Sequence, residues 1–337
     1  MRLLLLVWCL AAAWSPACEL CAIYNSSGAL CESDRGWTFA VAEQYIPYRT
    51  SQYNGQEVQF PPAYATYVDS SITHLVPGYN FSSRFGLNFN LPVTHLNFRR
   101  TDLRYSLTAP PVLVTDTGTE FGLGDPALIG RVTVLQQRSM AASLMVNALA
   151  GVKFPTGNSE RLEDEVGQAR LFESFLPPGT PHDPLAHSPF PVHQHDLALG
   201  SGSFDGVFGL TANARWRRAF FNTQFQYYLR SEGTAGFRYG DEWMVSGGPG
   251  LFVFLKDSWT LSLQLNAVYD VMGHDQLLGQ ISYLTGMTAC YLGPLVNFTW
   301  GKHFTANVGL DVPLVLNNNG SQDVPDYRLQ GGVSWRF

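Results

Sequence analysis

The chain has 337 residues and a formal net charge of −6; 45% of its residues are hydrophobic, 13% are aromatic and only 14% are charged. Soluble domains carry roughly 25% charged residues. This composition, with a mean hydropathy of −0.03, excludes a disordered acidic chain and a bundle of membrane-spanning helices. The negative charge balance argues against nucleic acid as a partner, because phosphate binding needs clustered Lys and Arg.

The first 17 residues have the three parts of a secretory signal peptide: basic Arg2, an apolar run over 3–14 and small residues before Cys18. The apolar run is shorter than the roughly 18 residues that cross a bilayer as a helix, and no later window reaches that length. We predict that residues 1–17 are removed. A lipid anchor on Cys18 is the less favoured alternative, because Ser15 stands where a Leu-like residue would be expected.

Three cysteines occupy the predicted periplasmic segment 18–35: Cys18, Cys21 and Cys31. Covalent haem attachment needs a histidine directly after the C-x-x-C pair, and the chain has Ala22 there. A thiolate metal site would want four soft ligands. A disulfide between two of the three is favoured in an oxidising compartment, and no cofactor is expected.

The most informative signal is strict alternation of apolar and polar residues, which is typical of strands with two different faces. In segment 259–270 the apolar positions include Leu261, Leu263 and Leu265, while Ser262 and Gln264 take the other face. The same pattern predicts about twelve strands, near 36–48, 70–81, 84–95, 122–136, 139–154, 198–216, 219–231, 240–256, 258–270, 282–299, 302–314 and 322–337.

Tight and long connections take turns between these strands, as in an up-and-down barrel with short periplasmic turns and long outer loops. Aromatic residues gather near both ends of the strands, as in interfacial girdles. The sequence therefore predicts an all-β fold, a transmembrane antiparallel up-and-down β-barrel over 36–337, with outer-membrane lipid around it. A soluble β-sandwich is the less favoured alternative, since closure removes the sheet edges that hydrocarbon does not tolerate.

Polar residues on the face opposite the lipid are the candidates for lining the lumen. They are Arg84, Asn88, Asp125, Arg131, Lys153, Arg215, Gln224, Gln264, Asp311 and Arg328. In a water-filled pore these groups would set selectivity, whereas in a closed barrel they would form an internal salt-bridge network, and the sequence leaves both open.

The longest predicted loop, 155–197, starts with acidic residues and ends with histidines. A short helix near 159–175 would let it fold into the barrel mouth. His193 and His195 beside Asp196 are weak candidates for a metal site, since imidazole and carboxylate suit borderline metals. A solvated loop without a metal is favoured, because the spacing matches no tight metal signature.

Three segments resemble a known family: 121–131 (FGLGDPALIGR), 150–157 (AGVKFPTG) and 199–203 (LGSGS). Their residue types and order are similar to the transporter-like outer-membrane family labelled for a meta pathway of phenol degradation, over roughly 70–337. The resemblance implies a channel for small solutes, with small aromatic or hydrophobic compounds as the candidates, and brings no binding residues with it. On physical grounds, the Gly and Pro residues in these segments are expected to end strands and to permit turns and bends.

The last strand ends in Trp335 and Phe337 and resembles the signal that the outer-membrane assembly machinery recognises. Motifs of hydrolases, zinc proteases, P-loops and dinucleotide-binding domains are missing, so we expect no enzyme. The leading hypothesis is an outer-membrane channel or transporter for small solutes in a Gram-negative bacterium. The alternative is a plugged structural barrel whose periplasmic Cys-bearing segment docks a redox or metal-handling partner.

Overall fold

The protein is described here from a computed structural model, which covers residues 35–337. The expected signal peptide at 1–17 and the cysteines Cys18, Cys21 and Cys31 lie outside the described residues. Removal of the signal, pairing of these cysteines and docking through them therefore stay predictions.

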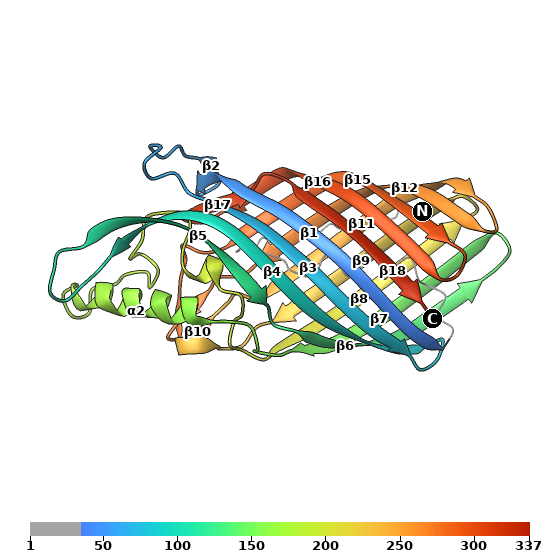
Figure 1. The fold of residues 1–337 in the computed structure, drawn as a ribbon, viewed down its shortest axis with the longest axis horizontal. Coiled ribbons are helices and arrows are strands. Elements are labelled where there is room, and N and C mark those ends of the chain that lie inside the picture. The colour runs from blue at the N-terminus through green and yellow to red at the C-terminus, as the bar shows by residue number, and fades with distance from the viewer. Residues whose placement is uncertain (1–34) are drawn as a thin grey trace, which may run out of the picture.

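Twelve long antiparallel strands form one closed barrel, as the alternation predicted (Figure 1). They are β1 (Gly36–Tyr53), β3 (Tyr67–Asn80), β4 (Phe85–Arg104), β6 (Ala127–Arg138), β7 (Ala142–Lys153), β8 (Asp205–Trp216), β9 (Ala219–Leu229), β11 (Glu242–Leu255), β12 (Trp259–Met272), β15 (Met287–Trp300), β16 (Phe304–Asn318) and β18 (Arg328–Arg336). Strand β1 pairs with β3 on one side and β18 on the other, which closes the barrel.

The wall has two chemically different faces. On β12, Ser262, Gln264 and Asn266 point inward and are at most 3% exposed, whereas Leu263 and Leu265 point outward and are each 50% exposed. Exposed aliphatic residues of this kind would be unfavourable in water but match the hydrocarbon core of a bilayer. The predicted alternation is therefore confirmed, and its apolar side is the outer one.

Several strand boundaries differ from the prediction. Strand β4 runs to Arg104, past the expected end at 95; β15 begins at Met287 rather than at 282; and the segment expected as one strand over 322–337 is split into β17 (Ser321–Pro325) and β18. The segment expected as one strand over 122–136 is split at Gly124–Pro126 into β5 (Val112–Leu123) and β6. Strand β5 extends the hairpin with β4 beyond the wall, because Pro126 cannot donate to a ladder. The strand expected from 198 begins only at Asp205, since Gly202 has a left-handed φ of 69° that breaks the extended backbone.

The barrel has one plain end and one elaborate end (Figure 1). The C-terminus and the tight turns lie at the plain end, which places that end in the periplasm. The long connections lie at the opposite, extracellular end. No helix within residues 35–337 is long and apolar enough to cross a membrane.

The elaborate end is covered by a cap, which we define as residues 154–204 together with a small sheet of β10 (Phe237–Arg238), β13 (Gln276–Leu277) and β14 (Gln280–Ile281). The cap contains helix α2 (Glu160–Ser174) and the 3₁₀ helix η1 (His195–Leu197). The remaining short elements are β2 (Gln56–Glu57), η2 (Thr234–Gly236) and β17 (Ser321–Pro325).

Helix α2 begins where its sequence favours a start. Asn158 Oδ1 accepts the backbone N–H of Glu160 at 2.9 Å, and Glu160 and Glu163 place negative charge in the first turn. Leu162, Val166 and Ala169 form its buried stripe and pack on Leu185, Phe237 and Leu277 of the cap. The helix expected near 159–175 is thus present, and it belongs to the cap.

Candidate functional site at the capped mouth

The predicted lumen-facing residues fall inside the barrel with one exception. Those on the inward face of strands are Asn88, Arg131, Lys153, Arg215, Gln224, Gln264, Asp311 and Arg328. Asp125 is buried in the link between β5 and β6. Arg84 is the correction: it is exposed in the tight turn 81–84 at the periplasmic end, because β4 begins only at Phe85.

Some of these side chains bond to other inward-facing residues along the wall. Arg131 donates to Asn80 Oδ1 at 2.8 Å and to Thr133 Oγ1 at 3.0 Å. Asp311 accepts hydrogen bonds from Asn266 at 3.1 Å and Gln330 at 3.0 Å. Arg131 and Asp311 thus belong to internal networks of the kind that the sequence allowed, although buried atoms such as Asn266 Oδ1 and Gln224 Nε2 have no hydrogen-bond partner among the described residues.

A second network, at the extracellular end, is charged and deeply buried. Lys153 Nζ lies 2.7 Å from Asp125 Oδ2 and 2.8 Å from Asp205 Oδ2, and the three side chains are at most 8% exposed. Lys153 also donates to Ser201 Oγ at 2.5 Å, and Asp205 has a further partner in Arg230 at 3.2 Å. Buried charges of this kind are stable only when paired and hydrogen-bonded, as they are here.

This network joins the three sequence segments that carry the family resemblance. Asp125 comes from the first, Lys153 from the second and Ser201 from the third. Asp125 Oδ1 accepts the N–H of Gly157 and its Oδ2 accepts the N–H of Ser201, both at 2.9 Å. The motifs therefore do more than end strands and permit turns. They fasten both ends of the segment 154–204, which we call the stems of the cap, to the barrel wall.

Close backbone contact explains two glycines in these segments. A Cβ on Gly157 would lie 2.6 Å from the Leu199 carbonyl oxygen, and one on Gly200 would lie 2.6 Å from the Gly157 carbonyl carbon. Neither approach is possible for a residue with a side chain. The two stems of the cap thus meet at a point that only glycine permits.

The network also keeps its acid charged. Burial alone would raise the pKa of Asp125, but the Lys153 ammonium and the N–H donors of Ser201 and Gly157 outweigh burial and lower this pKa below its usual value. Asp125 therefore stays a carboxylate at neutral pH and holds the stems together by charge-assisted hydrogen bonds.

From these stems the cap folds into the mouth. Val192, Leu197 and Leu199 are buried against the inner faces of β3 and β4, where they meet Val68, Leu96 and Phe98. The favoured expectation of a solvated loop is therefore wrong, and the alternative, a loop that folds into the mouth, is what the structure shows: His187, His195 and Leu197 are at most 5% exposed. The loop does so by burying apolar side chains against the wall.

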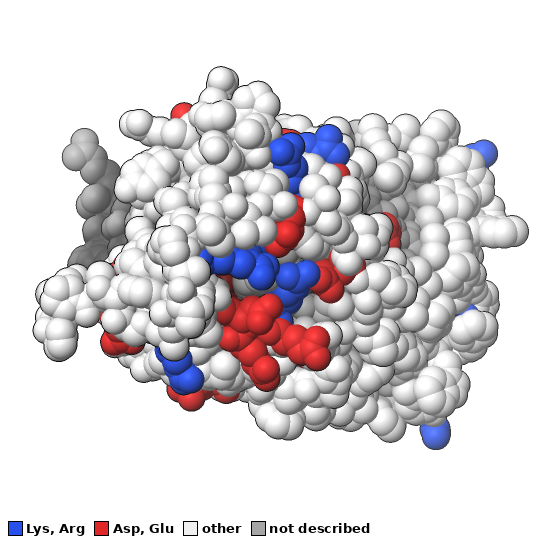
Figure 2. Space-filling view, turned by 60° about the vertical axis from the view of Figure 1, so that its left-hand side comes forward, with Lys and Arg blue, Asp and Glu red and all other residues white. Residues whose placement is uncertain are grey.

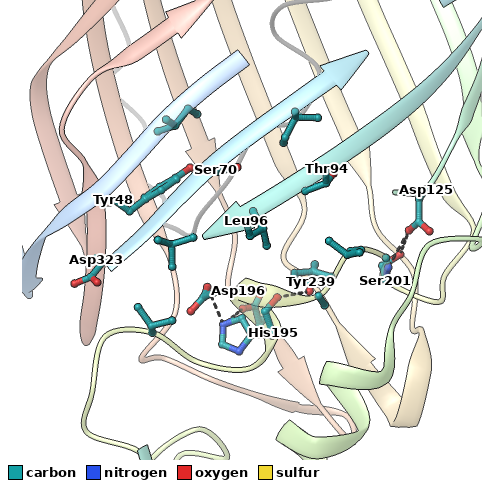
Figure 3. Close-up of a pocket in the computed structure, with 18 of the residues that line it drawn as sticks. Tyr48, Ser70, Thr94, Leu96, Asp125, His195, Asp196, Ser201, Tyr239 and Asp323 are labelled. Carbon is teal, nitrogen blue, oxygen red and sulfur yellow. Dashed lines mark hydrogen bonds and ion pairs between the residues drawn. The ribbon is translucent and has the colours of Figure 1, made fainter. Parts of the chain in front are cut away.

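A cavity of about 140 Å³ remains between the cap and the wall (Figure 3). One side is formed by strands β1, β3 and β4, with Ile46, Val68, Ile72, Thr94 and Leu96. The other side is formed by the cap, with Val192, His195, Asp196 and Leu199. An apolar cavity of about 150 Å³ is large enough to bind benzene, so this one has the size of a single aromatic ring.

The rim of the cavity is polar. Asp125, Lys153 and Ser201 bound it at one end, and Asp323 of β17 bounds it at another (Figure 3). Tyr239 donates its hydroxyl proton to the His195 carbonyl at 2.8 Å and so fixes the cap side. Arg230 and Asp275 also line the cavity, which therefore has an apolar side on the barrel wall and a charged side on the cap and rim. Apolar contact combined with converging polar groups is a usual feature of small-molecule sites.

Charged side chains gather around the centre of the extracellular end, while most of the surface in the same view is uncharged (Figure 2). Among them, Arg161 of α2 donates to Glu120 and, at 2.8 Å, to Gln194. Arg100 and Asp102 form a buried pair at 2.6 Å. The mouth is therefore mixed in sign.

The predicted metal candidates lie in the cap, in a cluster that the sequence indicated only in part. His193 contacts the buried Glu165 of α2 at 3.2 Å, and His195 lies 3.7 Å from the same carboxylate. His187 is a third partner of Glu165, at 3.1 Å. The expected ligand Asp196 lies 3.6 Å from His195 and is not part of the cluster formed by Glu165, His187 and His193.

The electrostatics of this cluster follow from its burial and its charges. Burial alone would raise the pKa of Glu165, but the surrounding histidines outweigh burial and hold it well below the usual value. Burial lowers the pKa of His195, yet the carboxylates of Asp196, Glu165 and Asp275 overcome that effect and raise it to about 10.

Comparison with known proteins gives a match in fold alone. No family model and no curated protein matches the sequence. Among solved structures, the COG4313 outer-membrane channel from Pseudomonas putida F1 is similar with a TM-score of 0.58 and 14% identity, covering 90% of this chain and 97% of that chain. The β domain of the Bordetella autotransporter BrkA gives a TM-score of 0.42 and 10% identity, over 90% of this chain and all of that one, and carries no argument here.

The class of the protein follows from its own architecture. A closed twelve-stranded barrel with an apolar outer belt and a polar inner face is an outer-membrane β-barrel, and it places the protein in the bacterial outer membrane. Its fold is similar to that of the COG4313 outer-membrane channel.

Proposed function

We propose that this protein is an outer-membrane channel for small organic solutes with an apolar body, of which a monoaromatic compound has the right size. The cavity of about 140 Å³ under the cap carries the proposal. It lies between the extracellular end and the interior of the barrel, where a solute entering from outside would pass.

The lining explains the preference for solutes of this class. Ile46, Val68 and Ile72 offer apolar contact to a bound solute. Each Å² of apolar solute surface that leaves water contributes about 25 cal/mol of favourable free energy, which favours an aromatic ring over a sugar. Ser70 and Thr94 supply hydroxyl groups that can meet one polar substituent such as a phenolic hydroxyl. The family resemblance of the three stem segments supports the same solute class.

Filling the cavity tests the proposal. Ile72→Trp places a bulky ring in the cavity from β3, and Leu107→Trp makes a comparable change at an exposed loop position, where Leu107 is 75% exposed. Purified full-length protein in liposomes would be assayed for entry of radiolabelled benzenesulfonate, a monoaromatic anion that does not cross the bilayer unaided, and of glucose. We expect Ile72→Trp to reduce benzenesulfonate entry severalfold and Leu107→Trp to leave it unchanged; equal entry through both variants would overturn the proposal.

A further inference from the structure

The cap contains a compact cluster of possible metal ligands, formed by Glu165, His187 and His193. Glu165 comes from the buried side of α2, and the two histidines come from the segment that crosses the mouth. Their ligand atoms all lie within 4.8 Å of one another. The cluster joins two parts of the cap that are otherwise separated by more than twenty residues.

The distances fit one ion at the centre of the group. Glu165 Oε1 lies 3.1 Å from His187 Nε2 and 3.2 Å from His193 Nδ1. In a tetrahedral zinc site with bonds of about 2.0–2.1 Å, neighbouring ligand atoms are about 3.3 Å apart. Two imidazoles and one carboxylate are a donor set that zinc accepts, with a fourth position left for another ligand.

A second observation points to the same place. His195 is 5% exposed, and its Nδ1 has no hydrogen-bond partner among the described residues. This nitrogen lies 3.7 Å from Glu165 Oε2, too far for a hydrogen bond but facing the cluster. A buried imidazole nitrogen left without a partner is costly, and it can become a fourth ligand once the ion displaces its proton.

The other oxygen of the carboxylate is already held in place. Glu165 Oε2 accepts the backbone N–H of Gln194 at 2.6 Å and that of His195 at 3.3 Å. These bonds orient the side chain, so that Oε1 faces His187 and His193. Supporting hydrogen bonds of this kind are usual around metal ligands.

The charge of the surroundings favours a cation. The carboxylate of Asp275 lies 3.8 Å from His195 Nε2, and that of Asp196 lies 3.6 Å from the same atom. Asp275 is buried, and its Oδ2 has no hydrogen-bond partner within the part of the chain that the structure describes. A divalent ion would compensate the charge of buried Asp275 and that of Asp196, whose side chain is 24% exposed.

We propose that Glu165, His187 and His193 bind one zinc-class divalent ion, with His195 as the candidate fourth ligand. Such an ion fastens helix α2 to the segment 187–199, whose residues Val192, His195 and Leu199 form the cap side of the cavity. The site is separate from the proposed transport of a solute, because binding of the ion can be measured without any solute.

The competing explanation is a set of hydrogen bonds without metal, in which each imidazole donates a proton to Glu165. The two explanations differ in what the purified protein binds. Full-length protein in detergent, stripped with a chelator and then dialysed, would be titrated with zinc chloride alone by calorimetry, and its bound metal would be counted by mass spectrometry.

Matched variants identify the ligands. His193→Gln removes one ligand from a partly exposed position, and Glu165→Gln removes the charge while keeping the size of the side chain. His182→Gln is the control, since His182 lies in the same loop but bonds only the Thr180 carbonyl among the described residues. Heat-modifiable electrophoretic migration would check that each barrel is folded.

We expect one zinc ion per chain in the wild type and in His182→Gln, and at least about tenfold weaker binding in His193→Gln and Glu165→Gln. Cobalt in place of zinc should give the visible bands of a tetrahedral site. Zinc should also slow hydrogen exchange over 187–199 in the wild type but not in His193→Gln. Absence of saturable binding, or equal affinity in the wild type and His193→Gln, would overturn the site; binding without slower exchange would overturn the fastening role.

Discussion

Replacing Lys153 by Met should loosen the cap in a pH-dependent way. Lys153 is the cation between two buried carboxylates, Asp125 at 2.7 Å and Asp205 at 2.8 Å. Asp205 keeps a partner in Arg230 at 3.2 Å, so Asp125 is the group that loses its counter-charge. Met has a similar apolar stem, and the change therefore removes charge with little change in packing.

The magnitude can be bounded from two directions. Removing one partner of a buried ion pair costs about 3–5 kcal/mol. A bare carboxyl can instead take up a proton, which costs about 1.4 kcal/mol for each pH unit above an ordinary Asp pKa of about 3.9. The expected loss is therefore about 4 kcal/mol at pH 7 and about 1.5 kcal/mol at pH 5.

The Asp125–Lys153 pair of the wild type should not respond over the same pH range. Because Lys153 lowers the pKa of Asp125 in the folded protein, its stabilising contribution is complete above the unfolded pKa and is lost only as pH falls through the lower, folded value. That loss lies below about pH 4. Other groups, such as Asp323, titrate in both proteins, so a gap between the variant and the wild type that widens from pH 5 to pH 7 is specific to the variant.

Hydrogen exchange over residues 154–204 is the suitable assay, because the wall can stay folded while the cap opens. Lys302→Met, in an exposed periplasmic turn, is the matched control at each pH. Asp125→Asn added to Lys153→Met should restore most of the protection, since it removes the unpaired charge. Equal exchange in Lys153→Met and Lys302→Met, or an effect that is as large at pH 5 as at pH 7, would refute the reasoning.

Three further changes test other parts of the structure. Gly157→Ala should destabilise the cap by about 1–3 kcal/mol, because its Cβ would meet the Leu199 carbonyl oxygen. Gly167→Ala is the control and should be neutral or favourable, because a Cβ there would have no atom within 4 Å. Hydrogen exchange over residues 154–204 measures both variants, and equal effects would contradict the argument. Glu43 lies on the lipid-facing side of β1 and accepts hydrogen bonds from Ser71 and Thr73, each at 2.5 Å. The double variant Ser71→Ala with Thr73→Ala leaves this carboxyl without donors and should lower the free energy of unfolding in urea by about 1–3 kcal/mol, whereas Glu43→Leu should not lower it. A larger loss in Glu43→Leu than in the double variant would refute this. Burial raises the pKa of Asp323 to about 6, so its ionisation opposes folding as pH rises from about 4 to 6. Asp323→Asn should therefore stabilise the protein by up to about 3 kcal/mol at pH 8 and not at all at pH 3. A stabilisation of the same size at both pH values would contradict this.

The barrel wall could be predicted from the sequence because each strand, taken alone, alternates apolar residues that face lipid with polar residues that face the interior. Leu263 and Leu265 alternate with Ser262, Gln264 and Asn266, and that pattern needs no knowledge of any other strand. Boundaries were less certain where backbone geometry overrides side-chain pattern. The split at Pro126 and the late start of β8 at Asp205 both follow from residues that cannot continue a ladder.

The stem network is a different case, because it depends on register between strands. Lys153 and Asp205 are directly paired across β7 and β8, and Ala127 pairs with Lys153 across β6 and β7, which brings Asp125 alongside. The tight turn at 139–141 pairs β6 with β7 and so indicates that Lys153 lies near the start of β6, beside Asp125, although a bulge between Thr133 and Leu135 shifts the register by one residue. Strands β7 and β8 are joined only through residues 154–204, so no short turn indicated that Lys153 would pair with Asp205.

The histidine cluster had no comparable signal. Glu165 reaches His187 and His193 only because α2 turns its buried stripe toward the segment 187–195, and helical periodicity alone does not say which segment will cover that stripe. The sequence did show an acidic residue at a position that shares a face with Leu162 and Ala169, an apolar stripe. A lone carboxylate on the buried face of a helix must find positive charge or a metal, and the histidines were the nearest groups able to supply either. That requirement, more than the spacing of His193 and His195, is the physical reason to expect a ligand site in this loop.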